Sequence, residues 1–354
     1  MSDATTSINL KRVRDADASG TGTEPTGSDQ QKRNRTSPSL TDTSIDQRSH
    51  HQGPVDHSIA PSKSIPRVPQ LEPSIFGIRP IPDLVHTVGQ FLCRLVDRPN
   101  VEIEAKLGTL VHNQTGQRIC LPIGSQCVLK SGDRGMGGGP QGRWYRFESN
   151  MTLEQHRAFN VMFNKRVQAS CQPGYRGAKV KYRHSREVDQ YYEVPVDGDR
   201  RGRRVRVTLD QGTREVVPNG ILEKRRIADL DIYCPNSHLD FRITVNEERP
   251  AQKPTHGELK RERHKDRLSY LHDGWKFDLT KVDVPKATNT SLDHSNVTYE
   301  LELEFDDTNR FLEERRKMLR GDGGPHQYYA IVETFLNNIN LLEPRSQAFD
   351  QVRR

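Results

Sequence analysis

Apolar and aromatic residues are scarce in this sequence. Hydrophobic residues make up 32% of the 354 residues, and aromatic residues make up 6%. No run of about 18 apolar residues occurs, so we expect no transmembrane helix, and the polar N-terminus has no apolar signal-peptide core. The five cysteines are scattered and form no C-x-x-C pair. This spacing argues against a disulfide framework or a zinc site and favours a reducing compartment.

Several catalytic signatures are also missing. No cysteine is followed by an arginine at the spacing that a cysteine phosphatase needs, and no G-x-S-x-G or H-E-x-x-H motif occurs. The glycine-rich segment 131–142 lacks the Gly-Lys-Ser/Thr ending of a phosphate-binding P-loop, so we interpret it as a flexible connection. These absences exclude cysteine-phosphatase and P-loop mechanisms.

The N-terminal 75 residues differ in composition from the rest of the chain. They contain no Trp, Tyr or Phe, and they cannot bury enough apolar surface to offset their ordering entropy. We therefore expect a disordered tail over 1–75. Its nine basic and nine acidic residues balance, so the net charge of +7 belongs to the remainder and suggests an anionic partner. Two basic clusters are candidate nuclear-import signals or a nucleic-acid arm, namely Lys11, Arg12 and Arg14, and Lys32, Arg33 and Arg35.

From residue 76 the chain shows regular periodicity. Helical spacing of apolar residues predicts helices over 82–95, 308–319 and 326–342, the last two separated by a glycine-rich break. Many short strands with turn signals between them indicate an antiparallel barrel or sandwich, in a domain of residues 76–345 with a C-terminal tail of 346–354. The predicted strands cover 101–111, 143–147, 180–184, 188–194, 203–209, 221–233, 241–247, 261–270, 275–282 and 297–305.

Charged residues alternate with apolar ones along several of these strands. Because side chains alternate between the faces of a strand, two sets share one face: Glu102, Glu104 and Lys106, and Glu300, Glu302 and Glu304. A solvated outer face is the ordinary explanation of such alternation. However, like charges at every second position repel, and the acidic strands are complemented by strands dense in Arg and Lys. A closed barrel lets both sets point inward, with its outer apolar face covered by helices and loops.

Such an interior has a defined chemistry. Clustered carboxylates without histidine or cysteine are hard oxygen ligands, which suit Mg²⁺ or Mn²⁺ and not zinc or copper. Arginine and lysine suit phosphate oxygens, and arginine binds them with two parallel hydrogen bonds. A site that combines both predicts a polyphosphate substrate, whose developing charge is neutralised by the cations. A carboxylate outside the metal site can orient or deprotonate water.

Four ordered motifs resemble those of the triphosphate tunnel metalloenzymes. The first and last are Glu102-x-Glu104-x-Lys106 and Glu300-x-Glu302-x-Glu304. The intermediate motifs resemble the fungal metal-dependent RNA 5′-triphosphatases, the β subunits of mRNA capping enzymes, and are Arg263-x-Lys265-x-Arg267-Leu268-Ser269-Tyr270 and Asp278-x-Thr280-Lys281-Val282. The resemblance covers roughly 78–340.

The resemblance implies a mainly β (α+β) fold, an eight-stranded antiparallel β-barrel tunnel with flanking helices. It implies hydrolysis of the γ-phosphate of triphosphate-ended pre-mRNA to a diphosphate end, the first step of capping, with Mg²⁺ or Mn²⁺. By similarity the metal ligands are Glu102, Glu104 and Glu304. Glu300 and Glu302 complete the acidic floor, with Glu302 a candidate for positioning water. The implied phosphate-binding residues are Arg206, Lys224, Arg263, Lys265, Arg267, Lys276 and Lys106. Asp278 and Thr280 support the site, and Glu248, or Glu247 in a shifted register, is a further acidic tunnel residue.

Two features depart from the family pattern. Lys276 stands where we expect an arginine, which keeps the charge and loses the two-pronged hydrogen bonding. The only tryptophans are Trp144 and Trp275, so the Trp-containing peptide with which family members dock on a guanylyltransferase is not visible. The implied partners are 5′-triphosphate RNA and that guanylyltransferase, the capping enzyme α subunit. A homodimer stays open, no membrane partner is expected, and the inferred role implies a nuclear location.

Two other functions are compatible with these residues. One is hydrolysis of inorganic tripolyphosphate or a small organic triphosphate in the same kind of tunnel. The other is a non-catalytic barrel that binds RNA, although such modules usually stack bases on exposed aromatics, which are few in this sequence. The basic balance and the intermediate motifs favour the RNA triphosphatase.

Overall fold

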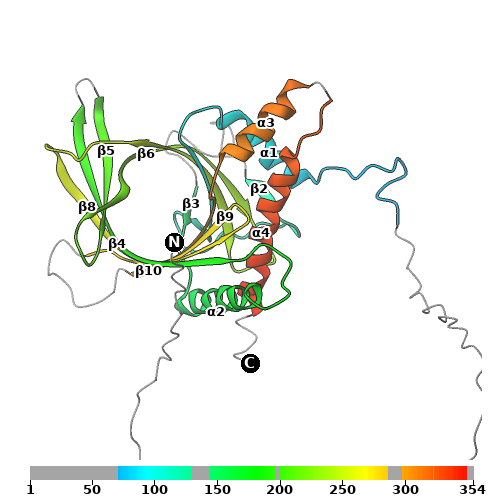
Figure 1. Cartoon of the computed structure of the whole chain (residues 1–354), viewed down its shortest axis with the longest axis horizontal. Helices are drawn as coiled ribbons and strands as arrows, with labels where there is room; N and C mark the ends of the chain where they lie inside the picture. Colours follow the sequence, from blue (N-terminus) through cyan, green and yellow to red (C-terminus); the bar gives the residue numbers. More distant parts are fainter. Residues whose placement is uncertain (1–70, 130–143, 197–198, 286–296, 322, 349–354) are drawn as a thin grey trace, which may run out of the picture. The chain divides into compact units, whose positions relative to one another are not determined.

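The computed structural model describes residues 71–129, 144–196, 199–285, 297–321 and 323–348 (Figure 1). The two basic clusters, almost all of the predicted tail and the glycine-rich segment 131–142 lie outside these residues, as does the chain after Ala348. The described residues after Gln70 form one compact unit. All that follows concerns this unit.

Eight antiparallel strands form a closed barrel, which confirms the predicted fold class. Their order around the barrel is β10-β9-β8-β4-β5-β6-β7-β1, and pairing of β10 with β1 closes the ring. Two shorter strands extend it, β2 (Cys127–Leu129) on β6 and β3 (Tyr145–Glu148) on β1. The eight are β1 (Val101–His112), β4 (Lys181–Val196), β5 (Asp199–Asp210), β6 (Val216–Tyr233), β7 (Asp240–Pro250), β8 (Glu258–His272), β9 (Trp275–Asp283) and β10 (Val297–Phe305).

The hydrophobic core lies outside the barrel wall. The apolar residues of the alternating strands, such as Ile103 and Leu303, are buried in one cluster with residues of the helices, such as Leu92 and Phe335. Charged residues occupy the alternate positions and line the interior. The ordinary arrangement of a small barrel, with apolar side chains inside, is therefore inverted.

Four helices cover part of the outer wall. They are α1 (Asp83–Leu95), α2 (Leu153–Ser170), α3 (Asn309–Arg320) and α4 (Tyr328–Ala348). Helix α2 contacts β9 and β10 and lies along the outer side of β10 in Figure 1. Helices α1 and α3 both contact α4. The contacts of α2 support β9 and β10, whose inward residues contribute to the site.

Helix α2 is the main element that the sequence analysis missed. Its polar residues interrupt the apolar periodicity, yet a capping box marks its start, because Thr152 and Gln155 satisfy each other's backbone N–H groups. Two predicted strands, 180–184 and 188–194, form the single long strand β4, and the last helix extends to Ala348, beyond the predicted end of the helix at 342. The strand is continuous because residues 185–187 pair with β8 despite their weak local strand signal.

We expect Phe163→Ala in α2 to destabilise the fold. The Phe163 ring stacks on Tyr270 of β8 at 4.8 Å between centroids and also contacts Phe277 of β9. Its loss should lower the free energy of unfolding by about 3 kcal/mol or more, measured by urea denaturation. Val161→Ala is the matched control, because Val161 is 51% exposed on the same helix and its truncation should cost under about 0.5 kcal/mol. Equal effects of the two changes would contradict this account of the core.

Candidate active site in the barrel interior

The two acidic motifs lie next to each other inside the barrel. β1 and β10 pair with Glu104 opposite Glu304 and Lys106 opposite Glu302, although Lys106 and Glu302 are 196 residues apart in the chain. A single cavity of about 1090 Å³ runs through the barrel. The charged residues of both motifs line it: Glu102, Glu104, Lys106, Glu300, Glu302 and Glu304.

Basic side chains from other strands line the same cavity. They come from β5, β6, β8 and β9, which make up the rest of the wall together with β4 and β7. Every cation that the sequence analysis named for phosphate binding is among them: Arg206, Lys224, Arg263, Lys265, Arg267 and Lys276, beside Lys106 of β1. The cavity thus brings hard oxygen ligands and phosphate-binding cations into one space.

Three glutamates form a compact carboxylate cluster. Glu102, Glu104 and Glu304 each offer one oxygen, and these oxygens lie within 4.8 Å of one another. Asn246 of β7 holds two of them, since its amide Nδ2 donates to Glu102 Oε2 and to Glu104 Oε1, both at 2.9 Å. Asn246 was missed by the sequence analysis, and only its place opposite Glu102 in the register reveals it.

This cluster suits a divalent cation by its chemistry. Three carboxylate oxygens so close together repel one another, and hard oxygen donors of this kind are preferred by Mg²⁺ and Mn²⁺. Burial raises the pKa of Glu104, and it raises the pKa of Glu304 to about 7, because the charged forms are poorly solvated. A positive charge is therefore needed to keep the cluster ionised, and the residues present fit a metal ion.

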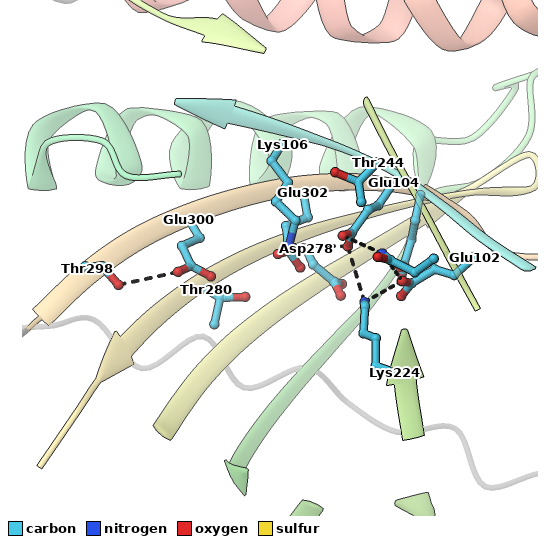
Figure 2. A network of polar contacts seen from close by, with 12 residues as sticks. Glu102, Glu104, Lys106, Lys224, Thr244, Asp278, Thr280, Thr298, Glu300 and Glu302 are labelled. Carbon is cyan, nitrogen blue, oxygen red and sulfur yellow. Dashed lines mark hydrogen bonds and ion pairs between the residues drawn. The ribbon is translucent and has the colours of Figure 1, made fainter. Parts of the chain in front are cut away.

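Lysine ammonium groups supply positive charge in the structure itself. Lys224 Nζ contacts Glu102 and lies 3.7 Å from Glu104 (Figure 2). It also lies 3.3 Å from Glu248. Lys276 contacts Glu304 and lies 3.5 Å from Asp278. Lys276 stands where an arginine is expected. It therefore still places a positive charge at the carboxylate cluster.

Glu302 is distinguished from its neighbours by its titration. Burial alone would raise its pKa, but Lys106 and Arg267 outweigh burial and hold the pKa of Glu302 well below its usual range. Lys106 donates a hydrogen bond to Glu302 and lies 3.3 Å from Glu104. Glu302 is thus a partly buried carboxylate that stays ionised beside the cluster.

The arginines of β8 are held by carboxylates of β9 and β10. Arg263 donates to both oxygens of Glu300, at 2.9 and 3.0 Å. Arg267 pairs with Asp278 at 2.9 Å, and its Nε donates to Thr280 Oγ1 at 3.3 Å. Asp278 and Thr280 lie on the inward face of β9, opposite Glu302 and Glu300, and are only 1% exposed, so they orient Arg267 from beneath the residues that line the cavity.

Lys265 has a buried partner that the sequence analysis did not name. It lies 2.8 Å from Asp189 and 3.4 Å from Glu187 of β4, and Asp189 also accepts a hydrogen bond from Thr208 at 2.7 Å. Burial and the nearby Arg267 lower the pKa of Lys265 despite these carboxylates. The alternation of charged and apolar residues in Glu187–Tyr191 was the available signal for Asp189.

The register decides between the two glutamates of β7. Glu248 lines the cavity, 3.5 Å from Arg206, whereas Glu247 is not among the lining residues and pairs with Arg249 at 2.8 Å. The five cysteines all lie within the described residues, where none forms a disulfide and none lines this cavity. No helix in the described part of the chain is long and apolar enough to cross a membrane.

The chain matches a known protein family. A family model described as mRNA capping enzyme, beta chain, matches residues 78–348. The mRNA-capping enzyme subunit beta of Schizosaccharomyces pombe is 30% identical over 306 residues, which are 84% of this chain and 94% of that protein.

Solved structures agree with the sequence comparison. The S. pombe Pct1 RNA triphosphatase superposes with a TM-score of 0.65 at 30% identity, covering 78% of this chain and 98% of that chain. The structure of Pct1 in complex with the Spt5 CTD gives a TM-score of 0.64 at 31% identity, covering 77% and 98%. The chain therefore belongs to the β-chain family of mRNA capping enzymes and is a phosphohydrolase of the RNA triphosphatase type.

Proposed function

We propose that this chain removes the γ-phosphate from the 5′-triphosphate end of RNA and leaves a diphosphate end. One observation carries the proposal: the carboxylate cluster of Glu102, Glu104 and Glu304 shares one cavity with the cations of β8. A polyanion and a divalent cation need these two sets of ligands at the same place.

The glutamate cluster is the proposed metal site. Glu102, Glu104 and Glu304 would hold Mg²⁺ or Mn²⁺, with Asn246 and Lys224 positioning the glutamates. A divalent cation bound there supplies positive charge to the phosphoryl oxygens, on which negative charge develops during transfer. Such a cation would also displace Lys224 and Lys276 from the carboxylates, which frees both ammonium groups for phosphate.

The remaining cations are the proposed phosphate ligands. Arg206, Arg263, Lys265 and Arg267 are each paired with a carboxylate, at distances of 2.8 to 3.5 Å. The triphosphate would compete with these carboxylates, because phosphate accepts the same charge-assisted hydrogen bonds. Arg267 would keep its orientation during this exchange through the hydrogen bond from its Nε to Thr280 Oγ1.

Glu302 is proposed to orient the attacking water. Its strongly lowered pKa keeps it ionised at neutral pH and makes it a weak proton acceptor. Orientation by a hydrogen bond to the water therefore suits Glu302 better than complete removal of the proton. Glu300 and Glu248 remain acidic wall residues that hold Arg263 and Arg206.

The wider cellular role is also a proposal. A guanylyltransferase, the capping enzyme α subunit, would take over the diphosphate end, and a nuclear location follows from such a role. Trp275 is buried against Phe335, whereas Trp144 is 43% exposed, so only Trp144 among the tryptophans is available for docking. The complex of Pct1 with the Spt5 CTD makes a comparable peptide a candidate partner here.

The proposal is tested by phosphate release from RNA that carries a γ-labelled triphosphate end. We expect release of the terminal phosphate with Mg²⁺ or Mn²⁺ and none with a chelator, leaving a diphosphate end. Efficient cleavage of tripolyphosphate without cleavage of RNA would establish the small-molecule triphosphatase instead. RNA binding without any metal-stimulated release would establish the non-catalytic barrel.

Removal of any cluster glutamate should abolish turnover. We expect Glu102→Ala, Glu104→Ala and Glu304→Ala each to lower kcat by about 100-fold or more, because a metal ligand worth several kcal/mol in the transition state is lost. Metal affinity, measured by calorimetry, should fall in parallel. The matched control is Glu313→Ala on α3, an exposed glutamate outside the cavity. Near-normal activity of any cluster variant would disprove its assignment as a ligand.

Glu302→Gln separates water positioning from metal binding. The amide still accepts a hydrogen bond from Lys106 but carries no charge to hold the attacking water. We expect kcat to fall about 100-fold, within the range for general acid–base groups, while the calorimetric metal affinity changes less than about twofold. A large loss of metal affinity would instead place Glu302 among the metal ligands.

A further inference from the structure

The cavity has two ends that the strand directions define. β1 begins and β10 ends at one of them, which we call the β1/β10 end. β4 ends, and β5 and β8 begin, at the opposite one, the β4/β8 end. Along β10 the interior residues run from Glu300 to Glu304 toward the β1/β10 end, and Figure 2 shows Glu300, Glu302 and Glu102 spaced along this direction.

The β1/β10 end of the cavity is acidic. The glutamate cluster lies there, because Glu102 follows the first residue of β1 and Glu304 precedes the last residue of β10. The exposed Asp306 and Asp307 also line the cavity just beyond β10. The cations at this end, Lys276, Arg267 and Lys224, are already paired with carboxylates.

The β4/β8 end of the cavity is basic. Arg204 of β5 and Lys260 and Arg261 of β8 line it and are exposed to solvent. Glu193 lies 3.6 Å from Arg204, and Glu258 contacts Lys260, but neither glutamate is among the residues that line the cavity. Arg261 forms no ion pair within the described residues. We call Arg204, Lys260 and Arg261 the basic mouth.

An aromatic ring lies just inside the basic mouth. Tyr191 of β4 lines the cavity, opposite Arg206 and Arg261 in the register. Its hydroxyl lies 3.5 Å from Asp189, and the ring contacts no other aromatic ring among the described residues. An aromatic ring that lines the cavity beside arginines is suited to stacking with a nucleobase.

We propose that the tunnel is directional, with RNA entering at the basic mouth and its γ-phosphate reaching the glutamate cluster at the far end. This inference rests on the proposed function. The triphosphate lies along Arg263, Lys265 and Arg267, the first nucleotide lies near Tyr191, and the backbone phosphates that follow contact the basic mouth. The opposite orientation would draw the polyanionic chain past Asp306 and Asp307, which repel it.

The basic mouth therefore determines the preference for RNA over small triphosphates. In the variant Arg204→Ala/Lys260→Ala/Arg261→Ala we expect KM for a triphosphate-ended RNA of about ten nucleotides to rise about tenfold, with kcat within twofold. KM for tripolyphosphate, which has no backbone phosphates, should change less than about twofold. Binding of the same RNA in chelator, followed by anisotropy, should lose about 2 from its salt slope, since each phosphate contact on a single strand contributes about 0.7.

The matched control removes equal charge elsewhere. Arg157→Ala/Lys165→Ala/Arg166→Ala takes three exposed cations from α2, away from the cavity, and should leave KM for RNA within twofold. An equal rise in KM in this control, or an unchanged KM in the mouth variant, would overturn the inference. If the wild type is active in that experiment, the proposed function stands even where the inference about direction is overturned. Absence of metal-dependent release from RNA by the wild type would overturn the proposed function and the direction with it.

Photo-crosslinking tests the direction without turnover. A triphosphate-ended RNA with 4-thiouridine as its first nucleotide should crosslink to peptides that contain Tyr191 or residues 258–263, as identified by mass spectrometry. Crosslinks confined to residues 217–220 or 305–308, which line the cavity at the β1/β10 end, would show the opposite direction.

Discussion

The packing of like-charged carboxylates inside the barrel is the constraint on which this structure depends. Glu104 is 3% exposed and shares the interior with Glu102, Glu302 and Glu304. Buried charges without partners cost several kcal/mol each, so such an interior is tolerated only where cations from facing strands accompany it. The alternation of charge along β1 and β10 therefore makes sense only in a closed barrel whose other strands carry arginine and lysine.

The charged interior displaces the hydrophobic core to the outside. The apolar faces of the strands need a cover, and α1, α2, α3 and α4 provide part of it. Each site residue is consequently on a strand that is fixed by hydrogen bonds on both sides and by packing behind it. Rigid positioning of this kind is what a site acting through electrostatic preorganisation needs, because the groups do not reorganise during the reaction.

The ion pairs of the interior are also the means by which substrate would bind. Arg263 pairs with Glu300, and Lys265 pairs with Asp189. A triphosphate that enters the cavity would therefore meet cations that already have a carboxylate partner. It would exchange one anionic partner for another, and a metal ion would take the place of Lys224 and Lys276 at the glutamate cluster. Selectivity would then come from the spacing of the cations along the tunnel, which matches a chain of phosphates better than a single anion.

The sequence by itself determined in which strands charged and apolar residues alternate and which chemistry this alternation favours. These properties are local, because two-residue periodicity fixes the face of each side chain within its own strand. It did not indicate α2, Asn246 or Asp189. Tertiary structure alone decided the register between strands nearly 200 residues apart, the choice of Glu248 over Glu247, and the acidic and basic ends of the cavity. The physical reason is that barrel closure and interstrand hydrogen bonds, which no local pattern encodes, set how distant strands align.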